Sequence, residues 1–170
     1  QFIRDIHRDP DNAALTAAAM LLTFAYFPHQ YWDLVALHDL PIGLFHDLLD
    51  AFRQDVVKKR YATFDELMDY CRRSADPVGR LLLALYRRES PANLEASDAI
   101  CTGLQLANFW QDVAVDYAKG RVYLPQDDLA RHGVTERQIA ESRCDAAWRT
   151  LMRFQTARAR ELLVSGRPLA

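Results

Sequence analysis

Four polar residues at helical spacing give the clearest chemical signal in this chain. They follow one another at intervals of three, four and four positions and are Gln105, Asn108, Asp112 and Asp116. On a helix, this spacing aligns the side chains in one stripe, which we call the polar stripe. Carboxylate and amide oxygens are hard donors that suit Mg²⁺, which combines a few protein ligands with water and substrate phosphates. The pattern therefore predicts a magnesium site.

The residues beside the polar stripe are mostly apolar, which indicates where the stripe faces. Apolar side chains fill positions 104, 106, 107, 109, 110 and 113–115, and a helix that is apolar on most sides is normally buried. Because an unpaired buried carboxylate is costly, a cation is expected beside Asp112 and Asp116. The alternative for a lone DxxxD pair is a solvated helix surface. The apolar flanks and the neighbouring amides favour an interior metal site.

A second polar group follows within a few residues of Asp116. It contains Lys119, Arg121 and Tyr123, and Gly120 is expected to end the helix in the left-handed conformation. Two cations and a hydroxyl beside a metal-carboxylate site would steady a diphosphate leaving group through charge-assisted hydrogen bonds. Lys119 and Arg121 would equally well complement the negative end of the helix dipole. Chemistry alone leaves both interpretations open.

Three other aspartates are weaker candidates. Asp55 lies near the end of the apolar side of an expected helix, and a contribution to the cavity is the less favoured interpretation. Asp5 and Asp9 form a second DxxxD, but their neighbours are polar, so a solvated segment is favoured. The histidines show no metal-binding spacing, and there is no nucleophile elbow or glycine-rich phosphate loop.

Composition limits the class of protein. With 170 residues, 50% hydrophobic and 26% charged, the chain has the composition of one soluble globular domain. A formal net charge of −2 gives no basic surface, so no nucleic-acid partner is expected. Three scattered cysteines predict neither a disulfide framework nor a zinc site, and they fit a reducing compartment. The apolar run at 13–27 is shorter than the ~20 residues of a membrane span and lacks the flanks of a signal peptide.

The polar stripe needs a helix to carry it, and the rest of the chain also predicts helices joined by short turns. Glycines are few, and strand-like alternation is almost absent. Thr63 with Glu66 and Thr135 with Gln138 fit capping boxes, and Pro77 allows a new helix start. The expected helices cover about 12–27, 31–38, 44–59, 63–75, 77–86, 94–118, a short segment after Pro125, and 145–163. The predicted fold class is all-α.

Two segments resemble the signatures of a known family. Residues 105–125 read Q-x-x-N-x-x-x-D-x-x-x-D-x-x-x-G-R-x-Y-L-P, which is similar to the second aspartate-rich motif of the squalene/phytoene synthase family. Residues 55–79 resemble the middle signature of that family, with RYxxFxxLxxYC followed by VG. The first aspartate-rich motif, DDxxDE, and the C-terminal helices of the family are missing. We therefore expect residues 1–170 to be a single partial domain, the central part of the family fold.

The resemblance implies the all-α fold of class I isoprenoid synthases, here a partial helical bundle. In that family, Mg²⁺ ions hold a diphosphate between two aspartate-rich helices above an apolar cavity for prenyl chains. Within the family the likeness is to bacterial hydroxysqualene synthases, because Phe109-Trp110-Gln111 stands where other members have IxR or LxR. The implied reaction is ionisation of presqualene diphosphate, rearrangement of the cation and capture by water. Hydroxysqualene and diphosphate are the products, and no NADPH is implied.

The resemblance also implies roles for individual residues. The metal-binding positions match Asn108, Asp112 and Asp116, of which the two aspartates are the catalytic residues. Aromatic faces beside the site would stabilise a carbocation. The implied cofactor is Mg²⁺. Substrate-binding roles are implied for Gln105, Lys119, Arg121 and Tyr123 near the diphosphate, and for Tyr70, Gly79 and Phe109 near the prenyl chains.

Two alternatives stay open. A presqualene diphosphate or phytoene synthase would join two prenyl diphosphates head to head, although Gln111 in place of arginine argues against it. A non-catalytic helical module would use the polar stripe as a buried network or a partner surface. On the enzyme hypothesis we expect a cytoplasmic protein with peripheral contact at the inner face of the membrane, because its prenyl diphosphate substrate is a lipid. We also expect association with other enzymes of squalene biosynthesis, and no activity from this fragment alone.

Overall fold

The computed structural model describes Asp33 and residues 35–169. The chain divides into two compact units, residues 1–42 and 43–170. All the predicted site residues belong to the second unit. The expectation of a single partial domain stays a prediction.

Only a short part of the first unit is described. Residues 35–37 are helical. The chain then turns at His38 and Asp39, and Asp39 has a φ of 50°. The helix expected over 12–27 lies outside the described residues, as do Asp5 and Asp9. The solvated position predicted for this second DxxxD pair therefore stays a prediction.

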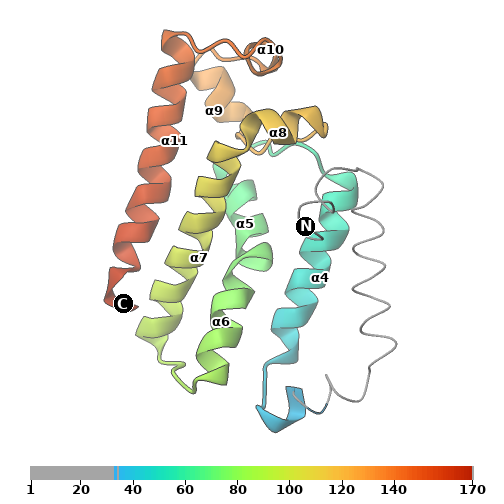
Figure 1. The fold of residues 1–170 in the computed structure, drawn as a ribbon, viewed down its shortest axis with the longest axis vertical. Helices are drawn as coiled ribbons and strands as arrows, with labels where there is room; N and C mark the ends of the chain where they lie inside the picture. The colour runs from blue at the N-terminus through green and yellow to red at the C-terminus, as the bar shows by residue number, and fades with distance from the viewer. Residues whose placement is uncertain (1–32, 34, 170) are drawn as a thin grey trace, which may run out of the picture. The chain divides into compact units, whose positions relative to one another are not determined.

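The second unit is built from helices (Figure 1). They are α4 (Ile42–Val57), which starts at the boundary between the units, α5 (Phe64–Ser74), α6 (Asp76–Leu85), α7 (Pro91–Gln111), α8 (Val113–Ala118), α9 (Gln126–Arg131), α10 (Glu136–Ala140), α11 (Ala146–Ser165) and a 3₁₀ turn, η1 (Arg167–Leu169). Within the described residues, the β-type pairing is limited to one isolated bridge between Arg60 and Val122. The all-α prediction is confirmed. None of the described helices is long and apolar enough to cross a membrane.

Side-chain caps explain where several of these helices begin. At the start of α5, the Thr63 hydroxyl accepts a hydrogen bond from the Glu66 N–H at 3.2 Å. Thr135 and Gln138 form the predicted capping box of α10, and Ser90 caps α7. Each cap satisfies backbone N–H groups that the first helical turn leaves without partners. These local signals explain why most helix boundaries lie within a few residues of their predicted positions.

The predicted break at Pro77 separates α5 from α6. Helix α6 starts at Asp76, with Pro77 in its first turn. Gly79 then lets α6 approach α7 closely, because a Cβ atom at that position would collide with Ser97 Oγ and Cys101 Sγ. A glycine at this contact therefore sets the distance between the two helices.

Helix α7 is the central element of the second unit, since α5, α6, α11 and η1 all pack against it. Figure 1 shows α7 between α6 and α11. Trp110 ties its C-terminal end to α11, because the indole N–H donates to Gln155 O at 3.1 Å. One face of α7 is thereby fixed in the core. Large side chains of this core are Leu67, Tyr70, Leu106, Phe109, Trp110, Leu124, Leu129 and Leu151.

The single helix expected over 94–118 is wrong, because the chain divides at Asp112 into α7 and α8. Asp112 has φ −99° and ψ 13°, yet the Asp116 N–H still bonds to Asp112 O at 2.8 Å. Helix α8 runs across the end of α7 in Figure 1 and packs against α10. The bend accompanies the packing of Val113 and Tyr117 against the core. Such tertiary packing is not contained in local helix propensity.

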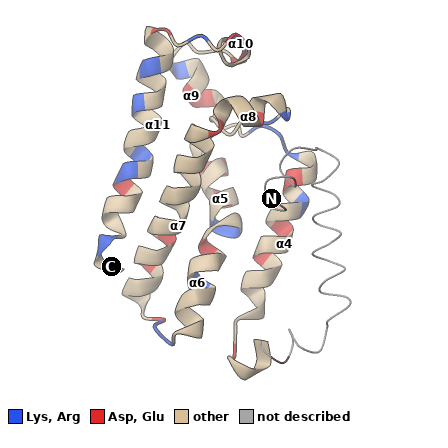
Figure 2. Ribbon diagram, in the orientation of Figure 1, with Lys and Arg blue, Asp and Glu red and all other residues tan. Residues whose placement is uncertain are grey.

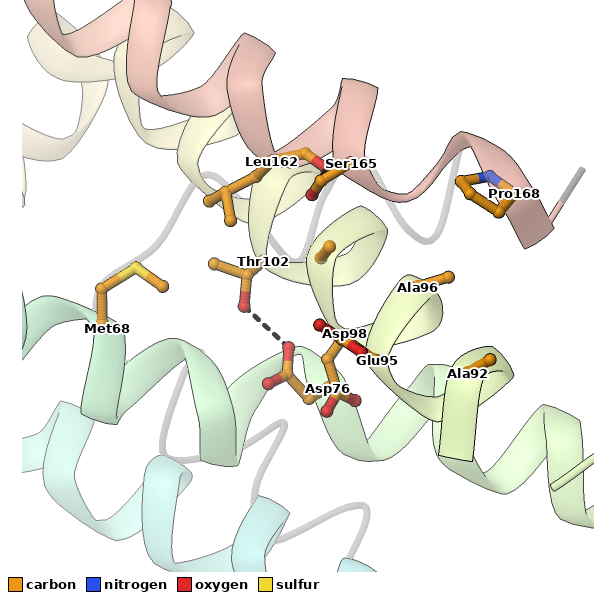
Figure 3. A pocket seen from close by; sticks show the side chains of 11 residues that line it. Met68, Asp76, Ala92, Glu95, Ala96, Asp98, Thr102, Leu162, Ser165 and Pro168 are labelled. Carbon is orange, nitrogen blue, oxygen red and sulfur yellow. Dashed lines mark hydrogen bonds between the residues drawn. The ribbon is translucent and has the colours of Figure 1, made fainter. Parts of the chain in front are cut away.

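A cavity of about 490 Å³ opens among α5, α6, α7, α11 and η1. Figure 3 shows Asp76 and Thr102 facing each other in it, and the Thr102 hydroxyl donates to Asp76 Oδ1 at 2.7 Å. Burial raises the pKa of Asp76 to about 6. The cavity wall contains none of the predicted site residues.

Candidate active site

Two stretches that are distant in sequence are joined by hydrogen bonds beside the end of α7. One is the link that follows α4, with Lys59 and Arg60, and the other is the segment that follows α8. The Val122 N–H donates to Lys59 O at 2.9 Å, and Arg60 Nη1 donates to Gly120 O at 2.6 Å across 60 positions of sequence. These bonds bring the C-terminal end of α4 to the predicted site.

The polar stripe bends with the helix that carries it. Gln105 and Asp116 are partly buried, whereas Asn108 and Asp112 are exposed. Asp112 lies at the bend itself, between α7 and α8. Within the part of the chain that the structure describes, the stripe is therefore open, where the sequence predicted an interior position.

The apolar flanks explain this difference, because they face two directions. One group is buried in the core, and the other is left partly open beside the stripe. Leu104 and Val115 belong to the second group, with exposed fractions of 52% and 53%. A helix that is apolar on most sides is thus covered on one side only in the described chain.

Asp116 lies among charges of both signs. Burial raises the pKa of Asp116, and the negative charges of Asp112 and Asp55 act in the same direction. Lys119 and Arg121 lower it. Figure 2 shows acidic and basic segments close to one another around α8. Because negative charge is concentrated at the bend, a bound cation would be stabilised there.

Asp55 also belongs to this cluster, although the sequence left it as the less favoured candidate. The Tyr70 hydroxyl donates to Asp55 Oδ2 at 2.9 Å. Burial raises the pKa of Asp55, while this hydrogen bond and the positive charges of Arg121 and Lys59 lower it. The available signal was its position one turn after Ala51, which is fully buried. Sequence reasoning missed Lys59, whose spacing of four residues from Asp55 was the signal that could have found it.

The two predicted cations after α8 occupy different environments. Lys119 is exposed, and its backbone N–H bonds to Asp116 O at 3.0 Å. Gly120 follows in the predicted left-handed conformation, with φ 75°. The chain then turns back, so that Arg121 Nη2 donates to Asp55 O at 3.3 Å. Of the two, Arg121 lies next to the carboxylates, while Lys119 lies where a helix end favours positive charge.

Four buried aromatic rings pack next to these polar groups: Tyr61, Tyr70, Phe109 and Tyr123. The Phe109 and Tyr123 rings stack with centroids 3.9 Å apart and an interplanar angle of 7°. The Tyr70 ring lies 6.1 Å from Tyr123 and 6.2 Å from Phe109. Burial, and after it the Asp55 charge, raises the pKa of Tyr70 and raises that of Tyr123 to about 12. Both hydroxyl groups therefore remain protonated donors at neutral pH.

Gly79 has a different structural setting. The side on which it lacks a Cβ faces Ser97 and Cys101 of α7. The close packing of α6 and α7 accounts for a glycine there. Its predicted role beside the prenyl chains stays a prediction.

The donor atoms of the polar stripe suit Mg²⁺ but supply only part of a coordination shell. Across the described ranges, no group of three or more histidine, cysteine, aspartate or glutamate side chains could hold a metal ion. The stripe instead offers the carboxylates of Asp112 and Asp116 and the amide of Asn108. Two carboxylates and an amide leave positions for water and phosphate oxygens, as Mg²⁺ prefers. The donor set thus fits a magnesium-diphosphate site that a substrate or another segment completes.

Comparison with known proteins points in the same direction. The squalene/phytoene synthase family profile matches residues 27–170. The hydroxysqualene synthase of Rhodopseudomonas palustris is 44% identical over 125 residues, which cover 73% of this chain and 42% of that protein. The phytoene synthase of Arthrospira platensis is 38% identical over 142 residues, which cover 76% of this chain and 46% of that protein.

A solved structure shares the arrangement of helices. The crystal structure of the squalene synthase HpnC from Alicyclobacillus acidocaldarius matches with a TM-score of 0.76 and 41% identity. The match covers 79% of this chain and 51% of that one. The chain spans less than half the length of both curated relatives. The region matched by the family profile includes the whole polar stripe and the segment after α8.

Proposed function

This chain belongs to the squalene/phytoene synthase family and has the all-α isoprenoid synthase fold, and from that premise we propose that the full-length protein is a hydroxysqualene synthase. The substrate is presqualene diphosphate, which reacts with water to give hydroxysqualene and diphosphate. One observation carries the proposal. The fold gathers the stripe carboxylates, Arg121 and the hydrogen-bonded pair of Asp55 and Tyr70 in one place.

The metal ligands in this proposal are Asn108, Asp112 and Asp116. Mg²⁺ bound there would neutralise negative charge on the departing diphosphate. Asp112 is exposed and so is accessible to an incoming diphosphate. Asp116 is partly buried beside other carboxylates, so a cation near it would relieve their repulsion. Gln105 continues the same helix face and would orient the diphosphate by hydrogen bonding.

The leaving group is held by the segment after α8. When the carbon–oxygen bond breaks, its electron pair goes to the diphosphate oxygen. The guanidinium of Arg121 would stabilise that charge, and the exposed ammonium group of Lys119 would reach the outer phosphate. The Tyr123 hydroxyl, which stays protonated because burial raises its pKa to about 12, supplies a further donor.

The cation left behind faces the aromatic cluster. The rings of Tyr70 and Phe109 would stabilise positive charge through their electron-rich faces. Stacking on Tyr123 fixes the orientation of the Phe109 ring. After rearrangement, a water oxygen bonds to the carbocation and one proton of that water is released. Because water supplies the final bond, no hydride donor takes part.

The isolated fragment is inactive in this proposal. Apolar side chains remain partly exposed on three helices of the second unit and would form one wall of the cavity for the prenyl chains. They are Leu49 and Phe52 on α4, Val78 and Leu82 on α6, and Leu104 on α7. The rest of the full-length protein would close that cavity and complete the metal site. Turnover of presqualene diphosphate by purified residues 1–170 would contradict this part.

Incubation of the full-length protein with Mg²⁺ and presqualene diphosphate tests the function. We expect a product with the mass of hydroxysqualene, formed without NADPH. Head-to-head condensation of farnesyl diphosphate or another prenyl diphosphate would instead favour a presqualene diphosphate or phytoene synthase, an alternative supported by the likeness to a phytoene synthase. Absence of any Mg²⁺-dependent binding of diphosphates would favour the non-catalytic helical module.

The lipid substrate also supports a proposal about location. The full-length protein would be cytoplasmic, contact the inner face of the membrane peripherally, and associate with other enzymes of squalene biosynthesis. Such contacts would pass apolar molecules between enzymes without releasing them into water. Flotation of the full-length protein with phospholipid vesicles is the measurement. Protein that stays in the vesicle-free fraction would contradict the membrane contact.

A further inference from the structure

Two adjacent lysines, Lys58 and Lys59, have different surroundings. Lys58 forms an ion pair with Glu66 in the first turn of α5, and its ammonium group lies 5.0 Å from the centroid of the Tyr61 ring. Lys59 instead donates from Nζ to Asp55 O at 2.6 Å. Lys58 is thus occupied by a structural contact, whereas Lys59 points toward the site.

The backbone of Lys59 is locked to the segment that carries Arg121. Lys59 O accepts the Val122 N–H at 2.9 Å, and two residues later Tyr61 O accepts the Gln126 N–H, also at 2.9 Å. Bonds on both sides of the bridge between Arg60 and Val122 prevent the two stretches from sliding. The position of Lys59 relative to Arg121 is therefore set by the fold.

The side chains of Lys59 and Arg121 converge on one oxygen atom. Lys59 Nζ and Arg121 Nη2 both donate to Asp55 O, at 2.6 and 3.3 Å. Burial lowers the pKa of Lys59, the positive charge of Arg121 lowers it further, and the negative charge of Asp55 partly opposes both effects. In the part of the chain that the structure describes, neither cation has a carboxylate oxygen within 4.0 Å. Two like charges held side by side repel each other, and an anion between them would remove that repulsion.

We propose that Lys59 is a further binding residue for the diphosphate group and acts together with Arg121. The inference rests on the proposed function, since it adds a cation to the same site. The Asp55 carboxylate attracts both cations through its charge but does not contact them, because it accepts the Tyr70 hydroxyl while the backbone carbonyl of Asp55 accepts from Lys59 and Arg121. A diphosphate oxygen would replace that carbonyl as the acceptor and gain two charge-assisted hydrogen bonds.

A purely structural role for Lys59 makes a different prediction. Asp55 belongs to the last turn of α4, and a lysine near a helix C-terminus can bond to its last carbonyl groups. If capping is the whole role, removal of the ammonium group lowers stability and leaves anion binding unchanged. The two roles are therefore separable by measuring binding and stability in the same variants.

Calorimetric titration of the full-length protein with inorganic pyrophosphate in the presence of Mg²⁺ is the test. Lys59→Gln should weaken pyrophosphate binding by about tenfold or more, the value expected for loss of one hydrogen bond between charged groups. It should also raise the KM for presqualene diphosphate. Lys59→Arg should keep most of the affinity. Lys58→Gln is the matched control, and it should lower the Tm while leaving pyrophosphate affinity unchanged.

The outcomes separate this inference from the proposed function. If the unmodified protein binds pyrophosphate and Lys59→Gln binds it equally well, the inference about Lys59 is overturned and the proposed function stands. If the unmodified protein neither binds pyrophosphate with Mg²⁺ nor converts presqualene diphosphate, the proposed function fails and the inference with it. Should Lys59→Gln not fold, Lys59→Met keeps the apolar stem and is judged by the same titration.

Discussion

Asp128 and Asp116 lie in two charged clusters that differ in burial and in how completely the carboxylate is paired. Asp128, on α9, is fully buried. Its carboxylate accepts hydrogen bonds from Gln155 at 2.8 Å, from Arg131 at 2.9 Å and from Arg158 at 2.5 Å. Asp116 is partly buried and, among the described residues, forms no ion pair within 4.0 Å. The first cluster is complete, and the second is not.

This difference in pairing indicates a structural role for the Asp128 cluster and a ligand-binding role for the Asp116 cluster. In the complete cluster, Arg158 also lies against the rings of Phe64 and Phe154, at 4.0 and 4.1 Å from their centroids. A buried charge with all its partners fixes α9 against α11 and has no capacity left for a ligand. In the incomplete cluster, carboxylates and cations are held close together without pairing, which is typical of sites that bind charged ligands.

Removing the buried carboxylate should have the largest effect on stability. Asp128→Ala removes a fully buried carboxylate and leaves the partly buried Arg158 without its ionic partner, so the free energy of unfolding should fall by roughly 3–5 kcal/mol. Urea unfolding of the full-length protein is the measurement. Asp127→Ala is the matched control, because Asp127 pairs with Arg131 at 3.8 Å near the surface and should cost no more than about 1 kcal/mol. Equal losses in both variants would remove the contrast between the clusters.

Neutralising the stripe should affect activity instead of stability. Asp112→Asn in the full-length protein should lower the turnover of presqualene diphosphate by about a hundredfold or more, because a proposed metal ligand is lost. The Tm should change little, since Asp112 is exposed. Asp50→Asn removes a carboxylate from the exposed side of α4, where it pairs with Arg53, and should leave turnover unchanged. Full activity of Asp112→Asn would favour the non-catalytic module.

A substitution at Gly79 tests whether this residue serves only the packing of α6 against α7 or also lines the prenyl cavity. Gly79→Ala should lower the free energy of unfolding by about 1–3 kcal/mol, because the new methyl group would overlap Ser97 and Cys101. If packing is its whole role, the KM for presqualene diphosphate will not change. Gly43→Ala is the control, since a Cβ there meets nothing within 4 Å. A raised KM with unchanged stability would place Gly79 at the prenyl cavity.

Asp76 lies in the separate cavity among α5, α6, α7, α11 and η1, and among the described residues its carboxylate accepts one side-chain hydrogen bond, from Thr102. Burial raises its pKa from 3.8 to about 6 in the folded protein. Between these two values the folded state therefore binds more protons than the unfolded state. The Asp76 contribution to stability is full below the lower value and is lost as the pH rises toward 6. Unfolding at pH 4 and pH 7 should show this loss, and Asp76→Asn should reduce it. Identical pH dependence in both proteins would contradict the assignment.

Local features of this fold were predictable from neighbouring residues. Four local features lie at the positions predicted from the sequence. They are the Thr63 cap, the Thr135 cap, the break at Pro77 and the left-handed Gly120. Each depends on contacts within one turn of helix, and such contacts are present in any chain with that spacing. The expected straight helix over 94–118 was wrong because the bend at Asp112 accompanies packing of α8 against α10 and the core.

The composition of the site was predictable only in part. Spacing and family resemblance identified the polar stripe and Arg121, but left Asp55 as a weak candidate and did not single out Lys59. Both depend on the backbone bonds that join the link after α4 to the segment after α8. Nothing in the spacing of either stretch indicates which other stretch it will meet.

The sequence by itself determined the helical class, most helix boundaries, the order of the chemical groups along α7 and α8, and the family. These follow from residue types at separations of three and four positions, where the helix geometry fixes the neighbours. Only the tertiary structure decided that the polar stripe bends at Asp112, that Asp128 is saturated, and that Asp55 meets Arg121. The last contact spans 66 positions, and contacts of that range form only when whole helices pack. The stripe was therefore predictable as a set of ligands, and its electrostatic environment was not.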